Sequence, residues 1–269
     1  MQRPTKAIVI AAGRGRRLGP HTEELPKCLV QVGKRTMLGW QHAAFTSAGV
    51  DELVMIRGYR GDVLEAGARE LTDNVRFVDN TEWERNNILL SLACARHEID
   101  GPVLLTYSDI VFTPDVVRAV VDAPADVALV VDRDFAAIYE GRTEHPLEEA
   151  EVCDLDSRGA IHRVGKRALP ATEAWGEFIG LLKLSADGAR WVGAAIDELT
   201  AIYAGREGEP FQRAASFRNA YLTDLLQHLI DGGRRLDPVA IHGEWREIDT
   251  GQDLERAIRL VQSRTEEWP

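Results

Sequence analysis

Cysteine and long apolar runs are both scarce in this chain. The three cysteines, Cys28, Cys94 and Cys153, are odd in number and widely scattered, so they match neither a disulfide framework nor a zinc site. We expect reduced thiols in packing positions. No apolar run approaches the roughly 18 to 20 residues that span a bilayer, and residues 1–6 form a polar lead without a signal-peptide core. We therefore expect a cytoplasmic protein that has no membrane partner.

Positive charge is also in short supply. The net charge of −11 argues against binding to nucleic acid, which needs a basic surface, so we expect no nucleic-acid partner. A small anionic ligand is still compatible with this negative net charge, because a local cationic loop can hold phosphates on an acidic protein. Only 5 Lys accompany 27 Arg, so each lysine draws attention. The composition, 45% hydrophobic and 28% charged, is that of an ordinary soluble globular protein.

Apolar runs and helical patterns alternate in the first half of the chain. The runs are typical of parallel strands buried on both faces, and they occupy residues 7–12, 53–56, 103–107 and 127–131, with a further short strand expected at 76–78. The helical patterns occupy residues 37–48, 62–71, 87–97 and 114–121. The last of these starts at Pro114, with Thr113 as a candidate N-cap. This alternation predicts an α/β fold with a doubly wound, mostly parallel sheet.

The pattern changes after about Asp134. Strand-like segments follow one another without helices between them, at residues 149–155, 160–166 and 177–184, which predicts a small antiparallel β addition. Ser185 is placed to cap a long helix that reaches Tyr203. A further helix, a strand and a last helix are predicted at residues 221–230, 236–242 and 250–269. Thr250 and Asp253 have the spacing of a capping box. We expect one domain spanning residues 1–269.

A glycine-rich turn follows the first strand. Small residues let backbone N–H groups approach a phosphate chain, and the side chains around them are cationic. The turn comprises Ala11, Ala12, Gly13, Arg14, Gly15 and Arg16. Arg17 and Lys27 can add charge to an α-phosphate and to an incoming anion. A dinucleotide fingerprint would need glycine in place of Leu18, and the Gly-Lys-Ser/Thr of a Walker A loop is absent. The alternative is a simple turn with solvated arginines.

Two aspartates follow strand-like segments far apart in the sequence. Asp109 leaves the carboxyl end of the strand at 103–107, and Asp249 precedes the capped last helix. Ligands of open α/β sheets bind outside such strand ends, and Mg²⁺ takes one or two carboxylates together with phosphate oxygens. The pair therefore predicts a Mg²⁺ site, with Glu247 as an acid behind it. Alone, Asp109 is a turn residue and Asp249 a helix-terminal charge.

Several strings together resemble one superfamily. They are AAGRGRRLG (11–19), LPKCLVQVGKRTML (25–38), NNILLSL (86–92), Ser108-Asp109, GEFIG (176–180) and WREIDT (245–250). The chain resembles nucleotidyltransferases that make nucleotide-diphospho compounds. The later motifs are most similar to the cytidylyltransferase branch that activates phosphocholine or 2-aminoethylphosphonate. The resemblance implies a Rossmann-like fold, a catalytic Arg17 and Lys27, and metal ligation by Asp109 and Asp249.

The resemblance also divides the chain by role. Residues 1–133 are expected to bind the nucleotide, 134–249 the acceptor, and 250–269 to form the C-terminal helix. Base and ribose contacts are expected from the polar residues Asn80, Asn86, Asn87, Ser91 and Ser108. Either Asn86 or Asn87 could instead cap the following helix. An ammonium group of the acceptor would suit aromatic faces beside acids, for which the candidates are Tyr139, Glu151, Trp175 and Glu177.

The predicted reaction is transfer of CMP from CTP to a small phosphate or phosphonate, with Mg²⁺ as cofactor and pyrophosphate as product. One alternative is a sugar-1-phosphate nucleotidyltransferase that uses UTP, dTTP or GTP. Another is a non-catalytic regulatory protein on the same fold. The presence of all four expected site residues argues against it: Arg17, Lys27, Asp109 and Asp249. A metal-dependent glycosyltransferase usually needs Asp-x-Asp, where this chain has Ser108-Asp109-Ile110-Val111. A homodimer is left open.

Overall fold

The computed structural model describes residues 2–265 and 268. Its strands are β1 (Lys6–Ala11), β2 (Gln31–Val32), β3 (Arg35–Thr36), β4 (Glu52–Arg57), β5 (Val75–Asp79), β6 (Val103–Tyr107), β7 (Ile110–Phe112), β8 (Val127–Asp132), β9 (Glu151–Leu155), β10 (Ile161–Lys166), β11 (Gly176–Leu184), β12 (Asp237–Ile241) and β13 (Trp245–Glu247). Its helices are α1 (Met37–Ser47), α2 (Gly61–Arg69), α3 (Ile88–Cys94), α4 (Pro114–Asp122), α5 (Phe135–Tyr139), α6 (Ala186–Ile202), α7 (Leu222–Asp231) and α8 (Gly251–Ser263).

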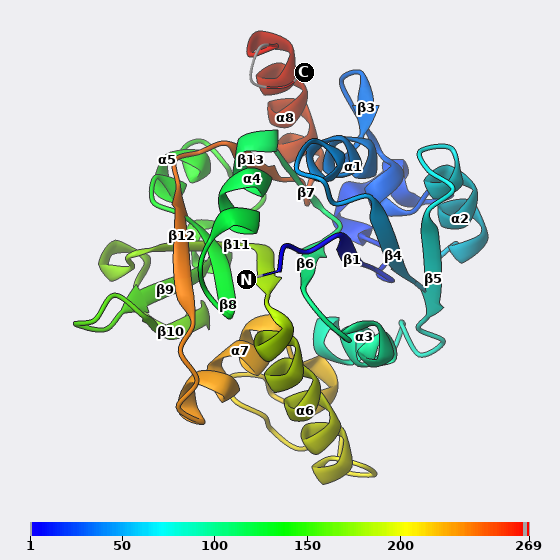
Figure 1. Cartoon of the computed structure of the whole chain (residues 1–269). Coiled ribbons are helices and arrows are strands. Elements are labelled where there is room, and N and C mark those ends of the chain that lie inside the picture. The colour runs from blue at the N-terminus through cyan, green and yellow to red at the C-terminus, as the bar shows by residue number, and fades with distance from the viewer. Residues whose placement is uncertain (1, 266–267, 269) are drawn as a thin grey trace.

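One central sheet organises the molecule (Figure 1). Strands β6, β1, β4 and β5 lie side by side and parallel, as their apolar runs predict. The predicted antiparallel strands are confirmed, but they join this same sheet. Strand β11 pairs antiparallel with β6, β8 and β9, and it connects the parallel part to the β9–β10 hairpin. The α/β fold with a mostly parallel sheet and antiparallel strands is therefore confirmed.

Helices cover both faces of the sheet, which makes it doubly wound (Figure 1). Helices α1, α2 and α4 pack on the face that includes Ala7 and Val9, and α3, α6 and α7 pack on the face that includes Ile8 and Ile10. Adjacent residues of β1 thus point to opposite cores, as the pleat requires. The division of the chain into halves at residue 133 stays a prediction.

A third, smaller hydrophobic core holds the glycine-rich turn in place. Helix α8 packs through Leu254 and Val261 against a cluster that contains Leu18, Trp40 and Ile248. Leu18 is the residue after Arg17, so its burial anchors the turn beside the site. Helix α8 begins as predicted, because Thr250 and Asp253 form a capping box.

Most of the predicted element ends are correct to within a few residues. The Ser185 hydroxyl accepts hydrogen bonds from the backbone N–H groups of Asp187 and Gly188 at the start of α6, as expected. Thr113 precedes α4 as predicted, but its hydroxyl makes no capping bond. The helix predicted at 87–97 is shorter, because α3 ends at Cys94 and a 3-10 turn follows. Among the described residues, no helix is long and apolar enough to cross a membrane.

Candidate active site

Lys27 is held under the glycine-rich turn. Gly15 has the left-handed backbone conformation, with φ of 68°, and a Cβ atom there would lie 2.7 Å from Cδ of Lys27. The lysine stem therefore occupies the space that a side chain at position 15 would need. The carbonyl of Ala12 accepts a 2.9 Å hydrogen bond from the N–H of Tyr59, which fixes the turn from its other side. Lys27 is left only 7% exposed.

The two predicted metal ligands come together because β7 and β13 pair. Glu247 at the end of β13 is opposite Ile110 at the start of β7, and the N–H of Ile248 donates to the carbonyl of Asp109 at 2.9 Å. Helix α1 stabilises the turn that carries Asp109. The buried side-chain amide of Gln41 donates hydrogen bonds of 2.8 Å to the carbonyls of Tyr107 and Ile110, on either side of this turn. This short two-stranded sheet places Asp109 beside Asp249.

Four charged side chains form one ion-pair cluster. The Lys27 ammonium lies 2.9 Å from Oδ2 of Asp109 and also contacts Oδ1 of Asp249, while Arg17 lies 2.5 Å from Oδ2 of Asp249. Burial alone would lower the pKa of Lys27, but the two carboxylates outweigh it and raise the pKa above its ordinary value. Burial would raise the pKa of Asp249, but Lys27 and Arg17 hold that pKa well below its usual range. Lys27 and Asp249 are therefore both charged at neutral pH.

A first pocket opens over the turn, and we call it the loop pocket. The residues that line it and were predicted for the nucleotide are Ala12, Gly13, Gly15, Arg16, Asn86, Asn87, Ser91 and Ser108. Arg17, Lys27 and Asp109 also line it, and Trp83 forms part of its wall. Gly13 faces open space, since a Cβ atom there would meet nothing within 4 Å. Backbone N–H groups at this position can therefore be approached closely by a ligand.

Three of the residues predicted for the nucleotide lie behind the loop pocket. Ala11 belongs to the core at the end of β1. Arg14 turns away, with its guanidinium 5.3 Å from the centre of the Tyr59 ring. Asn80 is 1% exposed, and its amide donates to Asn86 Oδ1 and Ser91 Oγ, both at 2.8 Å. Asn80 thus orients two residues that line the pocket.

Asn86 and Asn87 play different parts. Asn86 exchanges two hydrogen bonds with Asn80, which fixes the orientation of its amide. Asn87 occupies the position before α3, yet its side chain makes no capping bond and donates instead to the carbonyl of Asn219 at 3.0 Å. Asn86 is therefore the amide with the better defined orientation in the loop pocket.

A second pocket adjoins the first, and we call it the glutamate pocket. It is lined by Glu149, Glu151, Lys166, Glu177, Tyr221 and Glu247, together with residues that line both pockets. The shared residues are Arg17, Asn87, Ile88, Tyr107, Asp109 and Asp249. Three members of the charged cluster, Arg17, Asp109 and Asp249, therefore stand at the junction of the two pockets, and Lys27 lines the loop pocket beside them.

Buried carboxyl groups define the chemistry of the glutamate pocket. Glu151 accepts hydrogen bonds from the hydroxyls of Tyr107 at 2.9 Å and Thr223 at 3.3 Å, and burial raises its pKa to about 7. Glu177 accepts a 2.7 Å hydrogen bond from Tyr139, and burial raises its pKa to about 8. The Oε2 atom of Glu177 is buried without a hydrogen-bond partner among the described residues. A ligand cation or donor would satisfy it.

The two aromatic residues predicted for the acceptor take supporting positions. Tyr139, at the end of α5, is 7% exposed and reaches the pocket only through its hydroxyl on Glu177. Trp175 stacks with Arg133, whose guanidinium carbon lies 4.2 Å from the ring centre. The aromatic residues that line the pocket are instead Tyr107, Phe178, Tyr221 and Trp245. Of the four residues predicted for the acceptor, Glu151 and Glu177 line the glutamate pocket and the two rings do not, and their roles toward an acceptor stay predictions.

Sequence reasoning also missed residues that carry no local motif. Tyr107 lies against Gly180 in the GEFIG segment, where a Cβ atom would stand 2.2 Å from the ring, and φ there is 86°. That glycine bends β11 and makes room for the ring. Lys166 lies 3.2 Å from Glu149 and 5.0 Å from the centre of the Tyr221 ring. The small number of lysines was the one signal that could have singled out Lys166.

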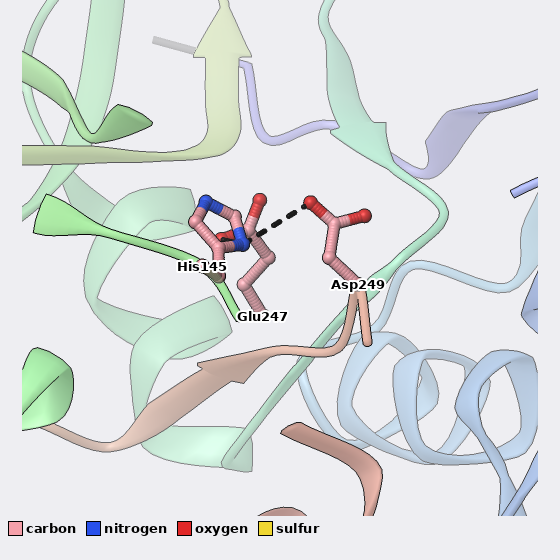
Figure 2. A group of neighbouring side chains, drawn as sticks. All are labelled: His145, Glu247 and Asp249. Carbon is pink, nitrogen blue, oxygen red and sulfur yellow. Dashed lines mark ion pairs between the residues drawn. The ribbon is translucent and has the colours of Figure 1, made fainter. Parts of the chain in front are cut away.

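His145 is the third missed residue, in the segment between α5 and β9. Figure 2 shows its imidazole facing Glu247 and Asp249, and Nδ1 lies 3.6 Å and 3.4 Å from their carboxylate oxygens. Burial and the nearby Arg142 lower the pKa of His145 to about 4, so its ring is neutral at neutral pH. Burial and the negative charge of Asp249 raise the pKa of Glu247 well above its usual value.

Comparison with known proteins agrees with this architecture. A CTP:phosphoglutamine cytidylyltransferase of Campylobacter jejuni is 31% identical over 258 residues, which cover 94% of this chain and 98% of the relative. A 2-aminoethylphosphonate cytidylyltransferase of Lancefieldella rimae is 30% identical over 60% of this chain and 61% of its own length. The solved CTP:phosphocholine cytidylyltransferase of Streptococcus pneumoniae has the same fold, with a TM-score of 0.71 at 20% identity over 97% of this chain and 100% of that one.

A family model described as the MobA-like NTP transferase domain matches residues 7–242. The match runs from β1 past the end of β12, so it includes the glycine-rich turn, Asp109 and most of the glutamate pocket. The resemblance to cytidylyltransferases seen in the sequence motifs is confirmed by the relatives. The chain belongs to the MobA-like NTP transferase family and is a nucleotidyltransferase.

Proposed function

We propose that this protein transfers CMP from CTP to a small acceptor that carries both a phosphate or phosphonate group and an amino group. The observation that carries the proposal is the position of Arg17, which lines two pockets of different character, beside Lys27, which lines the loop pocket and contacts Asp109 and Asp249 at their junction. The loop pocket offers backbone N–H groups and amides, and the glutamate pocket offers buried carboxyl groups. The Campylobacter relative, named for CTP and phosphoglutamine, matches nearly the whole chain and supports CTP as the donor.

The nucleotide belongs in the loop pocket. The open backbone at Gly13 and the exposed Arg16 suit a triphosphate, which needs donors and positive charge. Asn86, oriented by Asn80, offers an amide with a donor and an acceptor to the edge of cytosine. Trp83 supplies a hydrophobic wall. With the phosphates directed toward Arg17, the α-phosphorus lies at the junction of the pockets.

The acceptor's anionic oxygen attacks that α-phosphorus from the glutamate pocket. A new oxygen–phosphorus bond forms, the bond from the α-phosphorus to the bridging oxygen breaks, and the electron pair leaves with pyrophosphate. No general base is required, because the nucleophile is already an anion. Lys27 and Arg17 contribute by holding the reacting groups in line and by stabilising the charge that develops.

We also propose that the reaction uses Mg²⁺, held by Asp109 and Asp249. The fit rests on this structure, because both carboxylates contact the single ammonium of Lys27 and so converge on one region. Carboxylate oxygens are ligands that Mg²⁺ prefers, and it completes its coordination with phosphate oxygens and water. Bound there, the ion would supply charge neutralisation to the triphosphate.

The amino group of the acceptor belongs against Glu151 and Glu177. Glu177 has a buried oxygen without a partner, and an ammonium group is a donor that would satisfy it. Tyr107 and Tyr221 line the same pocket, and an aromatic ring beside a cation favours it by about 0.5 to 2 kcal/mol. The acceptors named for the three relatives, phosphoglutamine, 2-aminoethylphosphonate and phosphocholine, all combine a nitrogen group with a phosphorus group.

A panel of nucleotides and acceptors tests the proposal. CTP, UTP, dTTP and GTP are each combined with phosphoglutamine, 2-aminoethylphosphonate, phosphocholine, a hydroxyalkylphosphonate and sugar 1-phosphates, and pyrophosphate release is followed. We expect turnover with CTP and at least one amino-bearing acceptor. Turnover only with a sugar 1-phosphate would establish the rival activity, and no pyrophosphate from any pair would favour a regulatory role.

A further inference from the structure

The glutamate pocket presents an electrostatic difficulty for an anionic acceptor. Six carboxyl groups line it, from Asp109, Glu149, Glu151, Glu177, Glu247 and Asp249, whereas its cationic side chains are Arg17 and Lys166. Even with the pKa values of Glu151 and Glu177 raised by burial, a lining with so many carboxyl groups favours an ammonium group over a phosphate or phosphonate. Under the proposed function the same pocket must hold both, and a further positive charge close to the phosphorus end would favour the phosphate or phosphonate.

His145 marks where that charge would lie. Its side chain is 1% exposed, and Nδ1 is buried without a hydrogen-bond partner among the described residues. The ring is held edge-on against Tyr139, with centroids 5.9 Å apart. In this orientation Nδ1 points between Glu247 and Asp249, as Figure 2 shows. A buried nitrogen without a partner, facing two carboxylates, is an incomplete arrangement that a cation would complete.

The distances fit a metal ion. Zinc and similar ions bind nitrogen and carboxylate oxygen at about 2.1 Å, so two ligands of a tetrahedral site lie about 3.4 Å apart. His145 Nδ1 lies 3.4 Å from Oδ2 of Asp249 and 3.6 Å from Oε2 of Glu247. One ligand atom from each of the three residues falls within 4.8 Å of the others. Only small side-chain movements would bring all three onto one ion.

This position is distinct from the one proposed for Mg²⁺. Asp249 directs Oδ1 toward Lys27, on the side of Asp109, and Oδ2 toward His145 and Arg17. An ion on the His145 side would replace the contact of Arg17 with Asp249 and free that guanidinium for the nucleotide. It would also replace the 3.4 Å contact between Arg142 and Oε2 of Glu247, while Arg142 keeps its 2.8 Å hydrogen bond to Asp253.

We propose that His145, Glu247 and Asp249 form a second metal site, which binds a divalent first-row metal ion such as Zn²⁺ or Fe²⁺. An imidazole ligand favours these ions, whereas Mg²⁺ and Ca²⁺ prefer oxygen alone. Glu247 and Asp249 line the glutamate pocket, so an ion that they hold would lie at its wall. There the ion provides the missing positive charge for the phosphate or phosphonate group of the acceptor.

Cobalt titration of the nucleotide-free protein tests this site. Co²⁺ has visible absorption that reports nitrogen ligation and a coordination number below six, so binding is seen without turnover. We expect one Co²⁺ per chain with this spectrum, and we expect His145→Phe to weaken binding at least ~10-fold, the lower scale for disturbing a metal site. His145→Phe keeps a ring against Tyr139, and its thermal unfolding and circular dichroism are measured alongside.

Two further variants separate the possible results. His162 is a second histidine with a buried Nδ1, in β10 and close to Asp154, so His162→Gln serves as the matched control and should leave the cobalt spectrum unchanged. Asp109→Asn should raise the Mg²⁺ requirement of turnover under the proposed function yet keep the spectrum. Equal affinity in wild type and His145→Phe, or loss of the spectrum in Asp109→Asn alone, would overturn the second site and leave the proposed reaction standing.

Discussion

Gly15 and Lys27 are in such close contact that a methyl group on the glycine would stand 2.7 Å from Cδ of the lysine. Only glycine at position 15 leaves room for the lysine under the turn. Its backbone φ of 68° is a second reason for glycine there. Gly13 differs, since its surroundings are open in the free protein. The two glycines of the turn thus have separate physical roles. One makes room for a side chain of the protein, and the other leaves room for a ligand.

This difference predicts different behaviour of two alanine variants. Gly15→Ala should lower the free energy of unfolding by about 1 to 2 kcal/mol, the cost of a left-handed backbone for a residue with Cβ, and lower kcat because Lys27 is displaced. Gly13→Ala should leave the unfolding free energy within about 0.5 kcal/mol of wild type but raise KM for the nucleotide. Urea unfolding measures the free energy of unfolding of both variants, and steady-state kinetics measures their kcat and KM. Equal effects of the two variants on stability would contradict the separate roles of Gly15 and Gly13.

Lys27 should be the side chain whose loss costs most activity. We predict that Lys27→Ala lowers kcat at least ~10²-fold, the scale for removing one preorganised electrostatic group. Lys34 is an exposed lysine seven positions further on, over the Trp40 ring, and Lys34→Ala provides the control, with turnover near that of wild type. Pyrophosphate release under saturating substrates is the measurement. Near-normal turnover of Lys27→Ala in a folded protein would remove Lys27 from the mechanism.

Removal of metal should stop the reaction if Mg²⁺ is its cofactor. We expect a chelator to abolish pyrophosphate release and added Mg²⁺ to restore it. Asp109→Asn keeps the size of the side chain but weakens an oxygen ligand, so it should raise the Mg²⁺ concentration for half-maximal rate at least ~10-fold. Asp115, an exposed aspartate paired with Arg118 on α4, offers the matched control Asp115→Asn. An unchanged Mg²⁺ requirement in Asp109→Asn would place the ion elsewhere.

Glu177 predicts a dependence of stability on pH. Its pKa rises from the ordinary 4.5 to about 8 in the folded protein because it is buried. The folded state therefore binds more protons than the unfolded state between these values, and the free energy of unfolding falls as pH rises through this window. The contribution is fully present below pH 4.5 and lost as pH passes about 8.

The variant Glu177→Gln stays neutral at every pH, so its Tm should fall less than that of wild type across the same window. Glu149→Gln is the matched control, because Glu149 is paired with Lys166 and Arg167 and its pKa is lowered rather than raised despite its burial. Thermal unfolding followed by circular dichroism at several pH values gives the comparison. Parallel curves for wild type and Glu177→Gln would show that Glu177 is ionised throughout.

Local patterns made much of this structure predictable. The apolar runs gave β1, β4, β6 and β8, since strands buried on both faces are continuous and hydrophobic. Arg17, Lys27, Asp109 and Asp249 were predicted to meet, because each adjoins a turn or a strand end, and the structure brings them together. The acids Glu151 and Glu177, chosen as partners for an ammonium group, line the glutamate pocket, and their role toward an acceptor stays a prediction.

Residues whose position depends on distant contacts were not predictable. Trp175 was expected beside the ligand, but it stacks with Arg133, a partner 42 positions earlier that no local pattern indicates. His145 belongs to an irregular segment, and its place beside Asp249 depends on the pairing of β7 with β13. Those strands have only three residues each, too few to show a period. Asn80 was predicted as a nucleotide contact together with its polar sequence neighbours, yet it is only 1% exposed.

The product formed from CTP and an amino-bearing acceptor tests the central claim most directly. Phosphorus NMR and mass spectrometry of the reaction with phosphoglutamine or 2-aminoethylphosphonate would identify it. The account predicts a conjugate in which CMP is joined to the acceptor's phosphorus group, formed in equal amount with pyrophosphate and absent with Lys27→Ala. Consumption of UTP or GTP in preference to CTP, or pyrophosphate without any conjugate, would contradict it.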